Sequence, residues 1–243
     1  MTAQLAQTGF YYGPGRIGWG LDPTYVLILL ALVISSLVSA KMNATFSRYS
    51  KVRAYSGLTG AQAAQRILDL SGIYDVRIER IGGSLTDHYD PANKVLRLSD
   101  SVYGSASIAA IGVAAHECGH AIQHDHGYVP LNIRSSLVPV VNFASNMSWI
   151  FIMLGFVTRG IFLKLGIILF SASVLFQIVT LPVEFNASSR ALTQLRTLGI
   201  VDDREVRQSR KVLQAAALTY VAAAVTAILQ LLRLVLIANS RDD

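Results

Sequence analysis

The amino-acid sequence predicts a mainly α-helical membrane protein, with about four transmembrane helices and a small α+β unit between the first two. Charged residues make up only 15% of the 243 residues, and the mean hydropathy is +0.45. Four apolar stretches are long enough to cross a bilayer core, which takes about 20 residues: 21–40, 137–157, 161–183 and 217–238. A soluble fold would leave too little polar chain to cover all four, so we expect them to span a membrane. The middle two then form a transmembrane hairpin over residues 137–183.

Lys and Arg residues are distributed unequally among the segments between these stretches. Ten lie in residues 41–136 and six in residues 184–216, whereas the remainder of the chain holds five, of which Arg233 lies inside the last apolar stretch. Excess Lys and Arg mark cytoplasmic loops. We therefore predict that residues 41–136 and 184–216 are cytoplasmic, and that the tails 1–20 and 239–243 both lie outside the cell.

The overall charge and the cysteine content exclude some classes of function. The net charge of +6 follows from this topology and from attraction to anionic lipids, so the expected partner is the lipid bilayer and not a nucleic acid. Cys118 is the single cysteine, which rules out an internal disulfide and suits a reducing compartment.

The segment between the first two apolar stretches contains signals for a helix and a hairpin. A Thr-x-x-Gln capping box predicts a helix over residues 59–70. Residues 74–81 are β-rich, and the turn sequence Asp-Pro-Ala-Asn at 90–93 predicts a hairpin with strands at 86–89 and 94–99. We expect this hairpin either to receive a substrate backbone along its edge or to shield one side of the helix that follows.

That following helix carries the most informative motif of the chain, His116-Glu117-Cys118-Gly119-His120. We expect the helix to run from about residue 105 to residue 127. Residues four apart lie on one helical face, so His116 and His120 can bind one metal ion. Catalytic zinc sites have three protein ligands and a water, and a neighbouring carboxylate such as Glu117 can act as the general base.

Two residues are candidates for the third ligand. His126 has the spacing of the extended metzincin motif, but that motif needs a glycine where this chain has Gln123. Glu184 follows the predicted transmembrane hairpin, which returns the chain to the membrane face that it left after His120. We therefore prefer Glu184 and keep His126 as the alternative.

Polar residues near these ligands are candidates for stabilising a developing oxyanion. Catalysis of acyl transfer needs a donor that faces this charge. Tyr220 lies near the start of the last apolar stretch, and His88 and Tyr89 lie in the predicted hairpin. Arg190 is four residues after Asn186, a spacing that allows contact on one helix.

Several sequence runs together resemble the bacterial YugP-like family of neutral, membrane-bound zinc metallopeptidases. The similarity extends over most of the chain from about residue 25 onward, and is strongest at residues 85–91, 116–124, 181–188 and 217–223. The architecture is also similar to that of the HtpX-like and CaaX-type membrane proteases. The resemblance implies a zincin-like cytoplasmic unit in a bacterial inner-membrane protein, with one zinc ion. It implies that His116, His120 and Glu184 bind this ion and that Glu117 is the catalytic base.

The chain departs from the pattern of this family at two positions. Asn186 stands where members usually carry an aspartate two residues after the ligand glutamate. An asparagine retains a hydrogen bond that orients a ligand histidine but loses the charge. Cys118 stands where an apolar residue is expected, and we interpret it as a small buried side chain.

These observations predict a membrane-embedded, gluzincin-like zinc endopeptidase that cleaves membrane proteins or peptides at the cytoplasmic face, with a glutamate activating the zinc-bound water. The alternative is a non-catalytic, zinc-containing membrane adaptor or subunit that acts through a membrane-protein partner. Four protein ligands, for instance with His126 added, would favour the adaptor. An open coordination position beside Glu117 would favour the enzyme.

Overall fold

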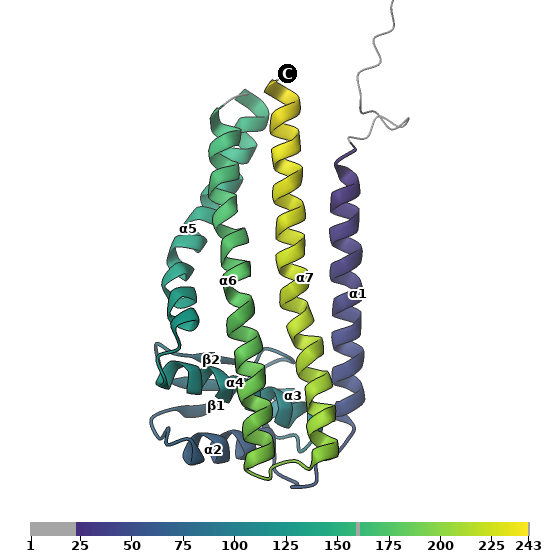
Figure 1. Ribbon diagram of the computed structural model, residues 1–243, viewed down its shortest axis with the longest axis vertical. Helices are drawn as coiled ribbons and strands as arrows, with labels where there is room; N and C mark the ends of the chain where they lie inside the picture. The colour runs from purple at the N-terminus through teal and green to yellow at the C-terminus, as the bar shows by residue number, and fades with distance from the viewer. Residues whose placement is uncertain (1–22, 159–160, 243) are drawn as a thin grey trace, which may run out of the picture.

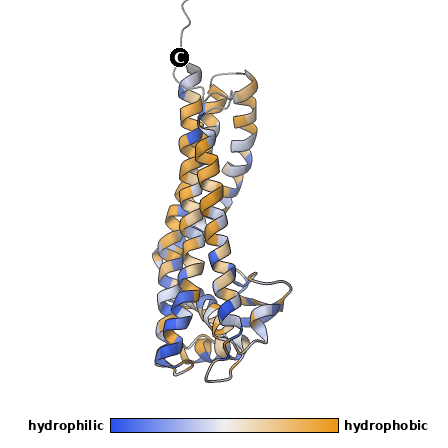
Figure 2. Ribbon diagram, turned by 90° about the vertical axis from the view of Figure 1, so that its right-hand side faces the viewer, coloured by the Kyte–Doolittle hydropathy of each residue, from blue (hydrophilic) through white to orange (hydrophobic). Residues whose placement is uncertain are grey.

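Four long helices lie side by side in the computed structural model, which describes residues 23–158 and 161–242 (Figure 1). They are α1 (Tyr25–Ser50), α5 (Val129–Thr158), α6 (Ile161–Thr197) and α7 (Asp203–Asp242). All four are long and apolar enough to cross a membrane. Their apolar surface lies toward the end of the bundle where α1 begins and α7 ends, whereas the other end is more polar (Figure 2). The predicted mainly α-helical membrane fold with four spanning helices is confirmed.

Two of the helices extend far beyond the apolar stretches seen in the sequence. α6 continues past residue 183 to Thr197, and α7 already begins at Asp203. Residues 184–216 are therefore mostly the ends of two continuous helices. The reason is a buried face on the extension of α6, where Ala187, Ala191 and Leu195 recur at helical spacing. Glu184 thus lies on a rigid helix.

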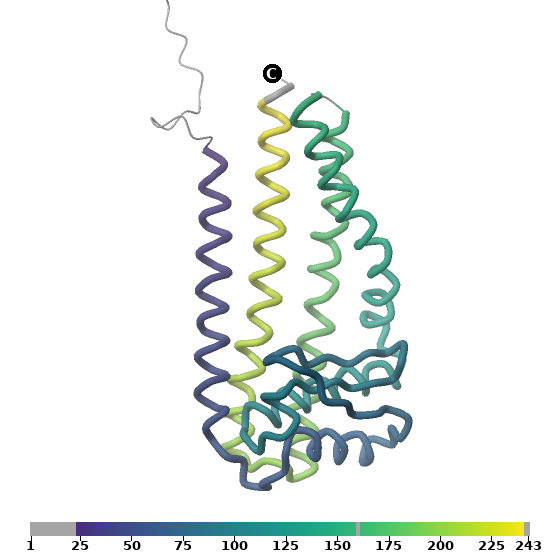
Figure 3. Tube along the Cα trace, turned by 180° about the vertical axis from the view of Figure 1, so that it is seen from behind, coloured from purple at the N-terminus to yellow at the C-terminus, as the bar shows by residue number. Residues whose placement is uncertain are grey.

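The small unit packs around the more polar end of the bundle (Figures 1 and 3). It comprises α2 (Gly60–Leu70), β1 (Arg77–Ile81), β2 (His88–Asp90), β3 (Val95–Ser99), α3 (Asp100–Tyr103) and α4 (Ile108–Asp125). The capping box at the start of α2 is formed as predicted, by the side chains of Thr59 and Gln62. The unit therefore combines helices with a small sheet, as the sequence indicates.

The sheet has three strands in the order β1-β3-β2. β2 and β3 pair antiparallel and form the predicted hairpin, whereas β1 pairs parallel with the other side of β3. The central strand β3 is the most buried of the three. This order leaves β2 at one edge of the sheet.

α4, which carries the His-Glu motif, is buried from Ile108 to Gln123. It packs against α6 and α2, and also contacts α7. Small residues make such close packing possible: a Cβ atom on Gly119 would lie 2.5 Å from the carbonyl oxygen of Ala187 on α6. The backbone of the motif therefore lies against the backbone of the helix that carries Glu184.

We predict that Gly119→Ala lowers the stability of the protein, because the added methyl group must push α6 away from α4. A cost of about 1–3 kcal/mol is typical of such overpacking. Gly112→Ala on the same helix is the matched control, since its Cβ would meet nothing closer than Ser209 Cβ at 3.8 Å. Thermal unfolding of the detergent-solubilised variants measures the difference. Equal melting temperatures for the two variants would contradict this account of the α4–α6 contact.

Candidate metal centre

Three potential metal ligands meet where α4 crosses α6. The Nε2 atoms of His116 and His120 lie 3.2 and 3.6 Å from Glu184 Oε2. The imidazole rings are nearly perpendicular, with centroids 4.8 Å apart. All three residues are at most 9% exposed. One turn of α4 supplies both histidines, and the continuation of α6 brings the carboxylate to them.

The geometry and the chemistry of this group fit a zinc ion. Ligands about 2.0–2.1 Å from a tetrahedral zinc ion lie about 3.4 Å from one another, close to the two histidine–carboxylate distances. The donor atoms of all three residues lie within 4.8 Å of one another, so the group could hold one metal ion. Glu184 Oε1 is buried and accepts no hydrogen bond from the described residues. The Arg134 guanidinium, 3.7 Å from this oxygen, compensates for part of the buried charge, and a bound cation would add to that compensation.

A chain of hydrogen bonds runs from Arg190 to His120. Arg190 Nε donates to Asn186 Oδ1 at 2.8 Å, which is the predicted contact between these two residues. Gln123 Nε2 donates to the same oxygen at 3.0 Å and to the carbonyl oxygen of Val183 at 2.9 Å. Gln123 Oε1 lies 3.0 Å from His120 Nδ1.

This chain determines which nitrogen of His120 can bind a metal. A guanidinium group only donates, so Asn186 must present its oxygen to Arg190. Gln123 then presents its amide nitrogen to that oxygen, and its own oxygen faces His120. His120 Nδ1 must carry a proton to donate to it, which leaves the lone pair on Nε2, the atom that faces Glu184.

Sequence reasoning missed the residues in direct contact with the ligands. Asn186 reaches His120 only through Gln123, and not directly as we expected from the family pattern. Ser188 Oγ lies 3.2 Å from His116 Nδ1, and Arg134 Nη1 lies 3.7 Å from Glu184 Oε1. A weak signal exists for Ser188, which lies one helical turn after Glu184.

His126, the alternative third ligand, lies apart from this group. It is the C-cap residue of α4, and its ring is exposed. Its Nδ1 atom lies 3.2 Å from Arg190 Nη1. Among the described residues, the group that could hold a metal consists of His116, His120 and Glu184 alone.

A cleft of about 420 Å³ opens beside the three ligands. His120, Glu184 and Glu117 line it. So do the three predicted oxyanion donors, His88, Tyr89 and Tyr220. The edge strand β2 forms one wall, and the first turns of α5 form another. The structure therefore brings the predicted catalytic residues together around one opening.

The candidate donors in the hairpin have other partners. His88 Nδ1 lies 3.0 Å from the carbonyl oxygen of Thr86, and its Nε2 lies 3.3 Å from Arg97 Nη1. Tyr89 Oη lies 2.8 Å from His124 Nδ1. Burial, together with nearby carboxylates, raises the pKa of Tyr89 to about 12, so its phenol stays protonated at neutral pH. The Tyr89–His124 contact therefore holds the hairpin against α4, whereas the partners of His88 lie within the hairpin itself.

The surroundings of Cys118, the unexpected residue within the motif, indicate that its role is structural. It is fully buried, and its thiol lies 3.6 Å from the carbonyl oxygen of Ala64 on α2. Burial raises the pKa of this thiol well above its usual value. A protonated, buried thiol packs like a small apolar side chain, as we expected from the sequence.

Comparison with known proteins agrees with this site. A family described as “Putative neutral zinc metallopeptidase” matches residues 24–239. The “Putative membrane protease YugP” of Bacillus subtilis (strain 168) is 50% identical over 219 residues, which cover 89% of this chain and 97% of that protein. No solved structure matches the chain. The resemblance seen in the sequence is confirmed: the chain belongs to the neutral zinc metallopeptidase family.

Proposed function

We propose that this protein is a membrane-embedded zinc-dependent endopeptidase, with His116, His120 and Glu184 as zinc ligands and Glu117 as general base. The observation that carries the proposal is the convergence of the three ligands beside a cleft that Glu117 also lines. An ion with three protein ligands keeps a position for water or substrate. The cleft gives a peptide access to that position.

The residues of the cleft account for the steps of peptide hydrolysis. A zinc ion held there supplies Lewis acidity, which acidifies water and polarises the scissile carbonyl. Glu117 takes a proton from the water as the water oxygen attacks the carbonyl carbon. Glu117 then passes this proton to the amide nitrogen as the carbon–nitrogen bond breaks, giving a carboxylic acid and an amine. Tyr220 and His88 both line the cleft. Tyr220 is the preferred donor to the developing oxyanion because both ring nitrogens of His88 have other partners.

The edge strand β2 supports an extended substrate. Among the described residues, β2 pairs with β3 on one side, and His88 and Tyr89 on this strand line the cleft. A peptide that adds to the free edge of such a strand is held by backbone hydrogen bonds, largely independently of its sequence. We propose membrane proteins or membrane-associated peptides as substrates, since the cleft lies near the apolar part of α5.

We propose that the metal centre faces the cytoplasm of a bacterial cell, in its inner membrane. α1 begins and α7 ends at the same end of the bundle, away from α4 (Figure 1), as an even number of spans requires. The Lys- and Arg-rich residues 41–136 and 184–216 belong to the opposite end, which excess positive charge marks as cytoplasmic. Both termini would then lie outside.

Removal of the metal tests the proposal. The full-length protein in lipid nanodiscs, supplied with zinc, is expected to cleave an unfolded or membrane-inserted test protein. Dialysis against a chelator should abolish cleavage, and stoichiometric zinc should restore it, because the Lewis acid contributes several kcal/mol to the transition state. Product peptides are identified by mass spectrometry. Zinc-loaded protein that binds but never cleaves any substrate would instead support the non-catalytic adaptor.

A further inference from the structure

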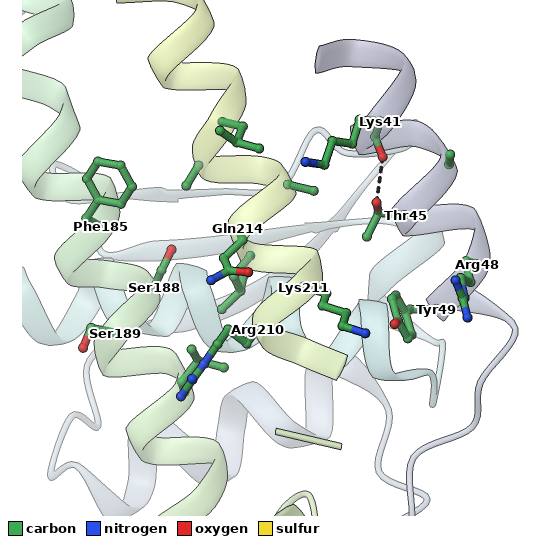
Figure 4. A pocket seen from close by; sticks show the side chains of 16 residues that line it. Lys41, Thr45, Arg48, Tyr49, Phe185, Ser188, Ser189, Arg210, Lys211 and Gln214 are labelled. Atoms are coloured by element: carbon green, nitrogen blue, oxygen red, sulfur yellow. Dashed lines mark hydrogen bonds between the residues drawn. The ribbon is translucent and has the colours of Figure 1, made fainter. Parts of the chain in front are cut away.

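A second hollow is lined by residues of α1, α6 and α7 (Figure 4). Its volume is about 970 Å³. We propose that this hollow, called the basic pocket below, binds the headgroup of an anionic phospholipid. The proposal rests on the membrane orientation proposed above and does not depend on the peptidase mechanism.

Four cations surround the basic pocket: Lys41 and Arg48 on α1, and Arg210 and Lys211 on α7. In Figure 4 the Lys41 side chain extends from α1 toward α7, and Lys211 extends from α7 toward α1. None of the pocket-lining residues in the described part of the chain is acidic. Nor does any described carboxylate form an ion pair with the four cations. The pocket therefore has uncompensated positive charge that suits a phosphodiester.

Hydroxyl and amide groups complete the lining. Ser188 and Ser189 on α6, Thr45 on α1 and Gln214 on α7 all contribute to it. The Thr45 hydroxyl donates to the carbonyl oxygen of Lys41 at 2.7 Å, and the Ser188 hydroxyl lies 3.2 Å from His116 Nδ1. A bound phosphate or glycerol headgroup would therefore take its hydrogen bonds mainly from Ser189 and Gln214. Basic pockets between transmembrane helices on the cytoplasmic side are a recurring way of binding anionic headgroups.

The depth of the basic pocket is that of a headgroup and not of free solute. On each of its three helices, the lining begins at the boundary between apolar stretch and polar extension: Lys41 follows residue 40, Phe185 lies two residues after 183, and Ala217 begins the last stretch. From there it continues along the polar extensions to Tyr49, Leu192 and Arg210. The membrane-facing end of the pocket is therefore at that boundary. A phosphate bound there is level with the phosphates of the surrounding leaflet, and its acyl chains continue into the bilayer.

Apolar surface for those acyl chains lies above the pocket on α1 and α6. Leu37 and Val33, one and two turns before Lys41, are 66% and 51% exposed. On α6, Phe185 is 50% exposed, and Ile178 lies on the same face two turns earlier. This apolar surface favours a phospholipid over a soluble phosphate, because only a phospholipid has acyl chains that would cover it while its phosphate lies in the pocket.

The basic pocket and the metal centre share a wall. Ser188 lines the pocket and also contacts His116 Nδ1 at 3.2 Å. Glu184 lies one turn before Ser188, on the cleft side of the same helix. A bound headgroup would therefore contact the helix that supplies the third ligand. Ser188 is left unchanged in the test below because it belongs to both sites.

Lipid binding to the purified full-length protein tests the proposal. Native mass spectrometry in detergent would compare short-chain phosphatidylglycerol, phosphatidylcholine with the same chains, and inorganic phosphate. We expect wild type to retain phosphatidylglycerol preferentially. The variants Lys41→Gln/Arg48→Gln and Arg210→Gln/Lys211→Gln should each bind it about 30-fold more weakly, as expected for two lost charges near a membrane surface.

Two further variants separate the pocket from general surface charge. Arg204→Gln/Arg207→Gln removes two exposed cations of α7 that do not line the pocket. This variant should bind lipid as wild type does. Ala44→Trp places an indole ring in the pocket without changing its charge, and should weaken lipid binding. Thermal unfolding confirms that each variant is folded.

Three results would overturn the proposal. They are undiminished lipid binding by Ala44→Trp or by the pocket charge variants, an equal loss in Arg204→Gln/Arg207→Gln, and binding of inorganic phosphate as tight as that of phosphatidylglycerol. The assay needs neither zinc nor a substrate. Its failure would therefore leave the proposed peptidase untouched, and failure of the peptidase assay would leave the lipid site untouched.

Discussion

Replacement of Glu117 by glutamine is expected to lower the rate of peptide cleavage by about 10²–10⁴-fold, the usual contribution of a general base. Glutamine has nearly the same size but cannot take a proton from water at neutral pH. Zinc content should stay at that of wild type, because Glu117 lies outside the ligand group. Cleavage rate and metal content are measured on the same preparation.

Asp125→Asn is the matched control for this substitution. Asp125 is an exposed acidic residue at the end of the same helix, so its loss should leave the cleavage rate unchanged. If Glu117→Gln cleaves as fast as wild type, the assignment of the general base is wrong. A loss of zinc in that variant would show instead that Glu117 helps to hold the metal.

Loss of Glu184 is expected to weaken zinc binding by more than about 100-fold, beyond the effect of removing a group that only orients a ligand. Glu184→Ala removes the third ligand, and Glu184→Gln removes its charge while keeping the packing of this buried residue. Both variants should lose zinc on dialysis, as metal analysis would show.

His126→Ala serves as the control for the ligand assignment. His126 has the spacing of an extended metal motif but is exposed and contacts Arg190. This variant should keep one zinc ion per chain and remain active. If His126→Ala loses zinc and the Glu184 variants keep theirs, His126 is the third ligand and the assignment of Glu184 is wrong.

Much of the metal centre could be predicted because local helix geometry and the membrane topology determine where its ligands lie. The spacing of His116 and His120 on one helix depends only on helix geometry. The position of Glu184 follows from the transmembrane hairpin, which must return the chain to the same membrane face. The helix–hairpin–helix order of the small unit could be predicted too, since its capping box and turn sequences act over a few residues.

The features that could not be predicted depend on how elements far apart in the chain pack against one another. Gln123 reaches Asn186, and Ser188 reaches His116, only because the backbones of α4 and α6 approach closely at Gly119. Hydropathy alone could not show that α6 continues to Thr197, because its buried face is short and made mostly of alanine. The basic pocket likewise arises only when three separate helices come together.

The coordination of the bound metal tests the central claim most directly. X-ray absorption at the zinc edge of the resting, full-length protein would count the ligands, separate sulfur from nitrogen or oxygen, and count the imidazoles from their multiple scattering. The account predicts two imidazole nitrogens and carboxylate or solvent oxygen at about 2.0–2.1 Å, without sulfur. A third imidazole, or a sulfur ligand, would contradict a metal centre formed by His116, His120 and Glu184.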